Sequence, residues 1–147
     1  MTINQLLQKL EATSPILQAN FGIERESLRV DRQGQLAHTP HPSCLGARSF
    51  HPYIQTDFCE FQMELITPVA KSTTEARRLL GAITDVAGRS IATDEVLWPL
   101  SMPPRLKAEE IQVAQLENDI ERHYRNYLAE KYGTKLQAIS GIHYNME

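Results

Sequence analysis

FGIERESLRV, at residues 21–30, is the stretch that decides the fold, because it alternates like a β-strand while it carries two glutamates. Strand side chains point alternately to the two faces of a sheet, so Glu24 and Glu26 share one face. Two like charges side by side repel each other, and a sheet gains nothing from them unless a cation or cationic substrate lies between them. Taken alone, the pair also fits an ordinary solvent-exposed face. The pattern predicts a strand at about residues 20–31 and raises the hypothesis of a metal site.

The composition predicts one soluble globular domain spanning residues 1–147. The chain is 41% hydrophobic and 22% charged, which is ordinary for such a domain, and its net charge is −3. Basic residues are scattered rather than clustered, so we expect no nucleic-acid partner. Neither a signal-peptide pattern nor a run of 18 apolar residues is present, so we expect a cytoplasmic protein with no membrane contact. Two cysteines without a secretion signal, Cys44 and Cys59, are expected to be free thiols.

The segments that flank the opening strand are predicted to be a helix and a hairpin. Apolar residues at helical spacing predict a helix over residues 3–12, which ends before Ser14 and Pro15. After the strand, DRQG at residues 31–34 predicts a turn, and residues 36–38 a return strand.

The next segment, residues 39–52, contains three prolines and a glycine, so we expect a surface loop. Three histidines lie in or beside it, at His38, His41 and His51. Because solvent-exposed loop histidines are common, we do not assign them to a metal.

Residues 53–69, YIQTDFCEFQMELITPV, are rich in aromatic and β-branched side chains and predict one or two buried strands. Asp57 and Glu64 lie seven positions apart in this segment. A single regular strand would send them to opposite faces. If both serve one site, a bulge, turn or break must lie between them.

Two long helices and a final strand are predicted in the second half of the chain. Ser72 and Glu75 form a capping-box pattern at the start of a helix over residues 73–93. The three prolines in residues 97–104 predict an extended crossing that Trp98 packs against the core.

A second helix is expected over residues 109–132, with Tyr124, Tyr127 and Leu128 on an inner face and Gly133 at its C-cap. From the pattern alone, core packing is the favoured role of Tyr124 and Leu128.

The last segment, residues 137–145, returns to strand character. Gln137, His143 and Asn145 have one parity, which places three polar groups on one face of that strand.

Collected along the chain, the candidate ligands are mostly hard oxygen donors, which suit Mg²⁺ or Mn²⁺ better than zinc. No Gly-rich phosphate-binding loop is present, so any nucleotide would be held largely through metal ions. The candidates are Glu24, Glu26, Asp57, Glu60, Glu64 and His143.

Four segments, FGIERESLRV, YIQTDFCEFQMELITPV, LWPLSMP and SGIHYN, resemble the N-terminal part of bacterial glutamate–cysteine ligases. The sequence is most similar to the ligase half of bifunctional glutathione synthases, and the resemblance covers essentially all 147 residues. It implies an enzyme that joins the γ-carboxyl of glutamate to the amine of cysteine, with ATP as co-substrate and Mg²⁺ or Mn²⁺ as cofactor. In that family ATP phosphorylates the γ-carboxylate, and the cysteine amine attacks the resulting acyl phosphate.

The resemblance also implies roles for individual residues. The metal ligands carried over by motif are Glu24, Glu26, Asp57, Glu64 and His143. The residues that match the pocket for the substrate cysteine are Phe58, Tyr124, Leu128 and Gln137. No role is carried over for Glu60, and Cys59 is expected to be structural.

The fold that the resemblance implies is an α+β arrangement similar to glutamine synthetase, with an antiparallel sheet whose one face is packed by helices. Because the family's catalytic region is longer, we expect residues 1–147 to be a domain truncated at the C-terminus, with the remainder of a parent chain as its partner. Such a piece is expected to lack ligase activity and to leave sheet edges and apolar surface uncovered. Two alternatives stay open: a non-catalytic metal-binding or assembly piece, and a related carboxylate–amine ligase with another substrate.

Overall fold

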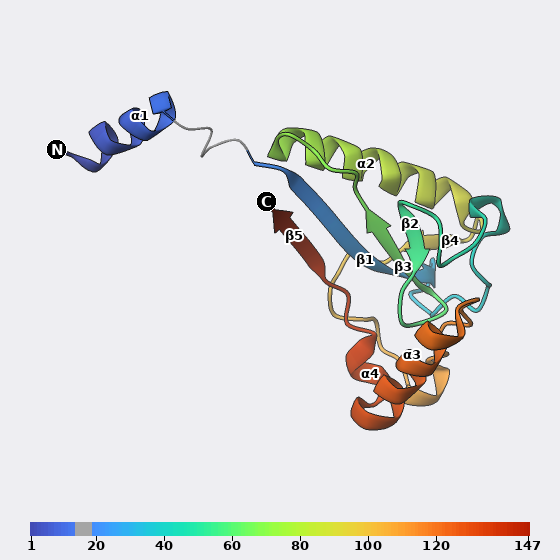
Figure 1. Cartoon of the computed structure of the whole chain (residues 1–147). Coiled ribbons are helices and arrows are strands. Elements are labelled where there is room, and N and C mark those ends of the chain that lie inside the picture. Colours follow the sequence, from blue (N-terminus) through green and yellow to red (C-terminus); the bar gives the residue numbers. More distant parts are fainter. Residues whose placement is uncertain (14–18) are drawn as a thin grey trace.

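The computed structural model describes residues 1–13 and 19–147, and its centre is the long strand β1 (Phe21–Asp31). A five-stranded sheet is built around this strand in the order β2-β3-β1-β4, and β5 (Ile142–Met146) also pairs with β1. Every strand pair in it is antiparallel. Figure 1 shows β1 running through the sheet with β5 along its first half. The strand predicted at residues 20–31 and the antiparallel α+β class are confirmed.

A tight turn divides the segment after the proline-rich region into β2 (Ile54–Thr56) and β3 (Gln62–Ile66). The Asp57 N–H donates to the Gln62 carbonyl at 3.0 Å, and the Gln62 N–H donates to the Cys59 carbonyl at 2.9 Å. The break that sequence parity requires between Asp57 and Glu64 therefore exists, and it lies just after Asp57.

Helix α2 (Thr73–Ser90) covers one face of the sheet (Figure 1). Its apolar side packs with the buried side chains of Met63 and Leu65 on β3. The Ser72 Oγ accepts from the Glu75 N–H at 3.1 Å, as the capping-box pattern predicts. One detail differs from the prediction: the helix ends at Ser90 rather than near residue 93.

The opposite face is covered at one end by a second apolar cluster. Leu28 and Val30 of β1 pack there with Phe58 and Phe61, and Leu128 lies against them. Since Leu28 and Val30 have the parity of Glu24 and Glu26, the apolar cluster continues the face that carries the glutamates. Helix α2 thus packs behind one face of the sheet, as the resemblance implies, and this apolar cluster lies at one end of the other face.

The expected hairpin follows β1. The Asp31 carboxylate accepts from the backbone N–H groups of Gln33 and Gln35, both at 2.8 Å, and Gly34 takes a φ of +80° in the turn. The return strand is shorter than predicted, because only Leu36 forms a bridge, with Val30.

The prediction of one helix over residues 109–132 is wrong. A short 3₁₀ turn, η2 (Ala108–Glu110), is followed by an extended segment, and α3 (Asp119–Tyr132) starts only after it. In that segment Val113 bridges Cys59, and the Ala114 N–H donates to the Phe58 carbonyl at 2.9 Å. Apolar spacing fits both arrangements, but these backbone bonds hold the segment against the turn after Asp57.

The strand predicted over residues 137–145 is also shorter. The chain forms a helical turn, α4 (Thr134–Gln137), and enters β5 only at Ile142. Gln137 therefore does not share the strand face of His143 and Asn145. Those two do share one face, as predicted.

The remaining elements connect these layers. They are α1 (Ile3–Thr13), drawn apart from the sheet in Figure 1, the 3₁₀ turn η1 (Ser43–Leu45) in the proline-rich segment, and β4 (Glu95–Leu97). The predicted end of the first helix at Ser14 and Pro15 lies outside the described residues. Trp98 is half-buried against the core, and its Nε1 donates to the Met102 carbonyl at 2.8 Å.

Both cysteines are free, Cys44 on the surface and Cys59 in the core. Within the described ranges, none of the helices has the length and apolar content to cross a membrane.

Candidate functional site

The strand register brings the sequence-predicted acidic residues to one place on the sheet. Glu26 of β1 lies opposite Glu64 of β3, and Glu24 lies opposite His143 of β5. Residues directly opposite each other on neighbouring strands point to the same face. The side chains of these four residues, which come from three strands, therefore share one face. We call these four, together with Asp57, the acidic face.

Asp57 belongs to the acidic face because the turn after β2 returns it toward β1. Burial raises the pKa of its carboxyl, and repulsion from Glu26 raises it further. The coupling to Glu26 shows that the two carboxylates act on each other, although 31 residues separate them in the chain.

Glu64 carries the largest electrostatic strain of the group. Burial raises the pKa of its carboxyl to about 7, and the charges of Asp57, Glu24 and Glu26 act in the same direction. Besides burial, three neighbouring carboxylates thus contribute to the raised pKa, so negative charge gathers around Glu64. Such a surplus is what a cation or a cationic group would relieve.

Hydrogen bonds hold the two glutamates of β1 in place. The Glu26 Oε2 accepts from the Gly141 N–H at 2.9 Å and from the Gln62 Nε2 at 3.4 Å. Its other oxygen, Oε1, lies 3.3 Å from the Nε2 of His143, which is 57% exposed. The Oε1 of Glu24 accepts from the Asn145 Nδ2 at 3.2 Å.

One arginine reaches the acidic face from α3. Arg125 lies 3.7 Å from the Oδ1 of Asp57 and 3.8 Å from the Oε2 of Glu121, and it lowers the pKa of Asp57 against the effect of burial. A single guanidinium shared between two carboxylates offsets only part of the negative charge. Sequence reasoning missed Arg125, although its spacing of four from Glu121 on a helix was a visible signal.

The chemistry of the acidic face fits a divalent cation of the Mg²⁺ type, because four carboxylates dominate it and one imidazole completes it. In the part of the chain that the structure describes, however, no three His, Cys, Asp or Glu side chains are arranged to hold an ion. Two histidines of the proline-rich segment have partners of their own: the Nδ1 of His41 lies within hydrogen-bond distance of the Thr56 Oγ1, and the Nδ1 of His51 accepts from the Ile54 N–H. The candidate donors lie on one face, but the described side chains do not close into a coordination shell.

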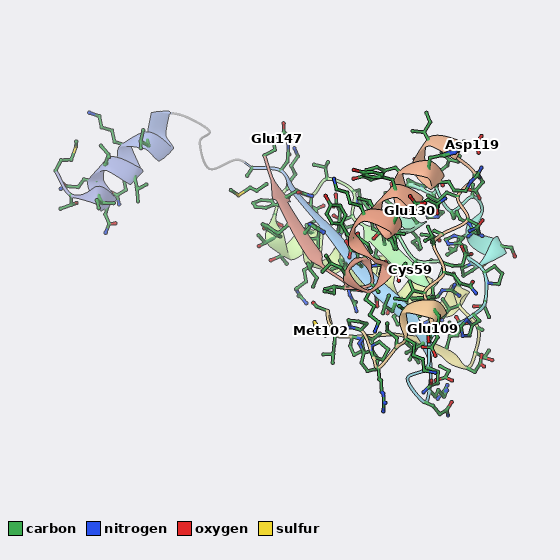
Figure 2. The ribbon with its side chains drawn as sticks, turned by 90° about the horizontal axis from the view of Figure 1, so that it is seen from below. Cys59, Met102, Glu109, Asp119, Glu130 and Glu147 are labelled. Atoms are coloured by element: carbon green, nitrogen blue, oxygen red, sulfur yellow. The ribbon has the colours of Figure 1, made fainter. Side chains whose placement is uncertain are left out.

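The four residues predicted for a substrate pocket are only partly brought together. Phe58 is buried and Leu128 packs in the same apolar cluster, next to Ala138. Gln137 is half-buried at the end of α4, one residue before Ala138. Tyr124 is 60% exposed, so the predicted inner aromatic face of the helix is wrong. Figure 2 shows α3, between Asp119 and Glu130, lying over the turn that holds Cys59.

A cavity of about 310 Å³ opens beside the acidic face, and it is lined by the first half of β1 and by the ends of the segments on either side of it, residues 66–69 and 145–147. Glu24 and Asn145 line it, together with Thr67 and apolar side chains such as Phe21 and Val69. None of the four predicted pocket residues lines this cavity.

Glu60, to which no role was carried over, serves the structure. Its carboxylate pairs with Arg48 and accepts from the Gln115 N–H at 3.0 Å, so it ties three segments together at a distance from Glu24 and Glu26. This supports leaving it out of the acidic face.

The sequence of this chain is similar to those of known proteins. The family model described as glutamate–cysteine ligase matches residues 4–147. A bifunctional glutathione biosynthesis protein from Streptococcus thermophilus is 97% identical over the whole chain, and the one from Pasteurella multocida is 46% identical. The chain spans about a fifth of the length of these curated relatives (20%).

Two solved structures have the same fold. The bifunctional glutathione synthetase of Pasteurella multocida superposes with a TM-score of 0.88 at 44% identity, and covers 99% of this chain and 19% of its own. The glutamate–cysteine ligase of Francisella tularensis, solved in complex with AMP, superposes with a TM-score of 0.86 at 36% identity, and covers 88% of this chain and 27% of its own.

Proposed function

This chain belongs to the glutamate–cysteine ligase family, and from that premise we propose that its acidic face forms part of the catalytic site for ATP-dependent ligation of glutamate to cysteine. The observation that carries the proposal is the convergence of Glu24, Glu26, Asp57, Glu64 and His143 from separate strands and a turn. This is the set that the family's motifs pick out. Four carboxylates on one face repel one another, so a sheet without a cation or cationic ligand gains no stability from them.

The proposed reaction has two steps. A γ-carboxylate oxygen of glutamate attacks the γ-phosphorus of ATP, which forms an acyl phosphate and releases ADP. The amine of cysteine then attacks the acyl carbon, the C–N bond forms, the C–O bond to phosphate breaks, and the amine loses a proton. A carboxylate is a poor electrophile, so phosphorylation is what makes the second step possible. The AMP held by the Francisella tularensis relative supports a nucleotide co-substrate.

In this proposal the acidic face holds Mg²⁺ or Mn²⁺, whose charge would let the polyanionic nucleotide approach the glutamate carboxylate. Glu24, Glu26, Asp57, Glu64 and His143 would be its ligands. The raised pKa of Glu64 supports this assignment, because a nearby cation would return that carboxyl to its charged form. Other ligands would have to come from elsewhere, since the described side chains form no closed shell.

The substrate cysteine is proposed to bind between the turn after Asp57 and α3. Phe58 and Leu128 supply buried apolar surface there, and Gln137 and the exposed Tyr124 supply polar groups near its rim. Arg125, which contacts Asp57 from the same helix, would lie between this pocket and the acidic face. This arrangement would bring the amine of cysteine toward the carboxylate that is phosphorylated.

We also propose that the surface beside the acidic face contacts the rest of a longer chain. The exposed apolar side chains of β5, namely Ile142, Tyr144 and Met146, support a partner surface supplied by the rest of a longer chain. We infer that residues 1–147 alone release no phosphate in an assay with ATP, glutamate and cysteine. We also keep the expectation of a cytoplasmic location.

The test uses a chimera in which this chain replaces the matched 147 residues of the Streptococcus thermophilus protein. We expect ATP-, glutamate- and cysteine-dependent phosphate release from the chimera, and a loss of at least about 100-fold in Glu24→Gln and Glu26→Gln. Glu130→Gln is the matched control, because it removes an exposed carboxylate on α3 and should change little.

The assembly alternative makes a different prediction for the same variants. If the acidic face only docks another segment, Glu24→Gln and Glu26→Gln would change stability or assembly and leave turnover close to that of the control. Circular dichroism and gel filtration of each variant separate the two outcomes. Assays with other amines in place of cysteine test the remaining alternative, a related ligase that uses another acceptor.

A further inference from the structure

Gln62 is a fully buried glutamine that lies directly beside the acidic face. It is 0% exposed, and it has the strand parity of Glu64 on β3. Its Nε2 donates to the Oε2 of Glu26 at 3.4 Å, and its Oε1 accepts from the Cys59 N–H at 3.4 Å. Both ends of a buried amide are therefore used, and one of them acts on a proposed cation ligand.

The two oxygens of Glu26 have different surroundings. Oε2 receives two neutral donors, the Gln62 Nε2 and the Gly141 N–H, whereas Oε1 lies 3.3 Å from the His143 Nε2. An oxygen that already accepts two hydrogen bonds has little capacity left for a cation. Oε1 is consequently the oxygen that Glu26 presents together with His143.

We propose that Gln62 is a positioning residue, which fixes the Glu26 carboxylate so that Oε1 faces the cation site. Partners of this kind orient metal ligands and set how basic they are. The proposal rests on the proposed function, since it concerns how the acidic face receives its cation.

A glutamine suits this position better than the side chains of similar size. Its amide is neutral, so it orients a carboxylate without neutralising it as a lysine or arginine would. A glutamate in its place would repel Glu26, and a methionine would fill the space but donate nothing.

The backbone of Gln62 adds a second connection. Its carbonyl accepts from the Asp57 N–H at 3.0 Å, and its N–H donates to the Cys59 carbonyl at 2.9 Å. One residue therefore joins the turn that places Asp57 to the side chain of Glu26. Because these backbone bonds do not depend on the side chain, substitution of Gln62 can alter Glu26 while the turn persists.

The experiment measures Mn²⁺ binding by electron paramagnetic resonance in the chimera, without substrates, for the unsubstituted protein, Glu26→Gln, Gln62→Met and Gln62→Leu. Sites lost in Glu26→Gln define the binding that is followed. We expect the dissociation constant of that binding to rise about tenfold in both Gln62→Met and Gln62→Leu, because neither side chain donates to Glu26. Gln115→Met, which removes an exposed amide bonded to the Val113 carbonyl, should leave it unchanged.

Thermal unfolding without metal reports whether each variant is folded, so a weaker site is not confused with a lost fold. If Gln62→Met does not fold, the smaller apolar Gln62→Leu carries the test. Glu26-dependent binding of wild-type affinity in every folded Gln62 variant would overturn the role of Gln62 alone. The absence of any Glu26-dependent Mn²⁺ binding in the unsubstituted protein would overturn the proposed function, and the role of Gln62 with it.

Discussion

Glu26 lies directly opposite Glu64 in the antiparallel register of β1 and β3, so two carboxylates form a cross-strand pair in a half-buried setting. Like charges in such a pair destabilise a sheet. The cost is visible in the pKa of Glu64, which burial and three neighbouring carboxylates raise to about 7. The fold therefore tolerates an unfavourable pair at the place where the cation is proposed to bind.

The Glu64 pKa predicts that stability without metal falls as the pH rises. Because the folded protein holds the Glu64 proton up to about pH 7 and the unfolded chain only to about 4.5, stability is lost through this window. Glu64→Gln should therefore be more stable than the unsubstituted chain by about 1–2 kcal/mol at pH 8, a value that allows for solvent screening, and equal to it at pH 4.5. Urea unfolding of the chelator-treated proteins at the two pH values measures this difference.

Glu130→Gln, which removes an exposed carboxylate, is the control. Its stability relative to the parent should be the same at both pH values. If Glu64→Gln were no more stable than the parent at pH 8, the electrostatic account of the acidic face would be wrong. Added Mg²⁺ should stabilise the parent and reduce the gap, because an ion that binds the folded state alone favours that state.

The buried pair of Arg29 and Glu95 predicts a large loss of stability when one partner is removed. The two are 1% and 8% exposed and 3.1 Å apart, and the guanidinium also donates to the Thr39 and Glu60 carbonyls at 2.6 and 3.1 Å. Arg29→Met should destabilise the fold by about 3–5 kcal/mol, because Glu95 would stay buried without a cation. Denaturant unfolding of Arg29→Met, Glu95→Met and the double variant measures the loss.

The double variant should recover part of that loss, because it removes both charges together. Equal destabilisation by the double variant and by Arg29→Met would mean that packing, and not the unpaired charge, dominates. This pair joins β1 to β4, so its effect should be on the fold rather than on the acidic face.

Much of the fold could be predicted from local patterns, and the acidic face shows why. Parity on β1 places Glu24 and Glu26 together, and the same rule applied to Asp57 and Glu64 requires the break that the turn before Gln62 supplies. Such a parity argument compares two residues along one segment of the chain, so it can be made without knowing the partner strand. The presence of His143 opposite Glu24 is a matter of register, which became an expectation only through the family's motifs.

The failures arise where long-range pairing outweighs local spacing. Val113 has helical spacing, yet its segment pairs with the turn around Cys59, and α3 starts where the Asn118 side chain accepts from the Ile120 N–H at 2.9 Å. Gln137 falls in a helical turn that follows Gly133, whose φ is +80°. The bridge to Cys59 depends on a distant partner that a single sequence does not identify, whereas Asn118 is a local N-cap signal that the helix prediction did not use.

His41 predicts a separate loss of stability at acid pH. Its side chain is 6% exposed, its Nδ1 lies 2.8 Å from the Thr56 Oγ1, and its Nε2 has no hydrogen-bond partner. Burial lowers the pKa of this imidazole to about 4 from 6.5, helped by the charges of Arg48 and Arg29. The unfolded chain therefore binds the proton first, and stability is lost as the pH falls from 6.5 to 4.

Removal of the imidazole should flatten this part of the pH profile. Between pH 7 and pH 4.5, His41→Asn should lose about 2–3 kcal/mol less than the parent in urea unfolding. His38→Asn changes an exposed histidine in the same segment and should follow the parent. Parallel profiles for the parent and His41→Asn would show that His41 is not the titrating group.

Gly141 predicts a defect in the acidic face that leaves the fold intact. A Cβ at this position would lie 3.2 Å from the His143 Nε2 and 3.8 Å from the Glu26 Oε2, while the N–H that donates to Glu26 would remain. Since His143 is 57% exposed and free to swing away, Gly141→Ala should change the unfolding free energy by less than about 1 kcal/mol. The displaced imidazole should show weaker Mn²⁺-induced broadening of its NMR signals.

Gly88→Ala in α2, where a Cβ meets nothing within 4 Å, is the control. It should stabilise the helix by about 0.5–1 kcal/mol and leave the broadening of the His143 signals unchanged. Broadening in Gly141→Ala as strong as in Gly88→Ala would mean that His143 does not need the space above Gly141 to meet the ion.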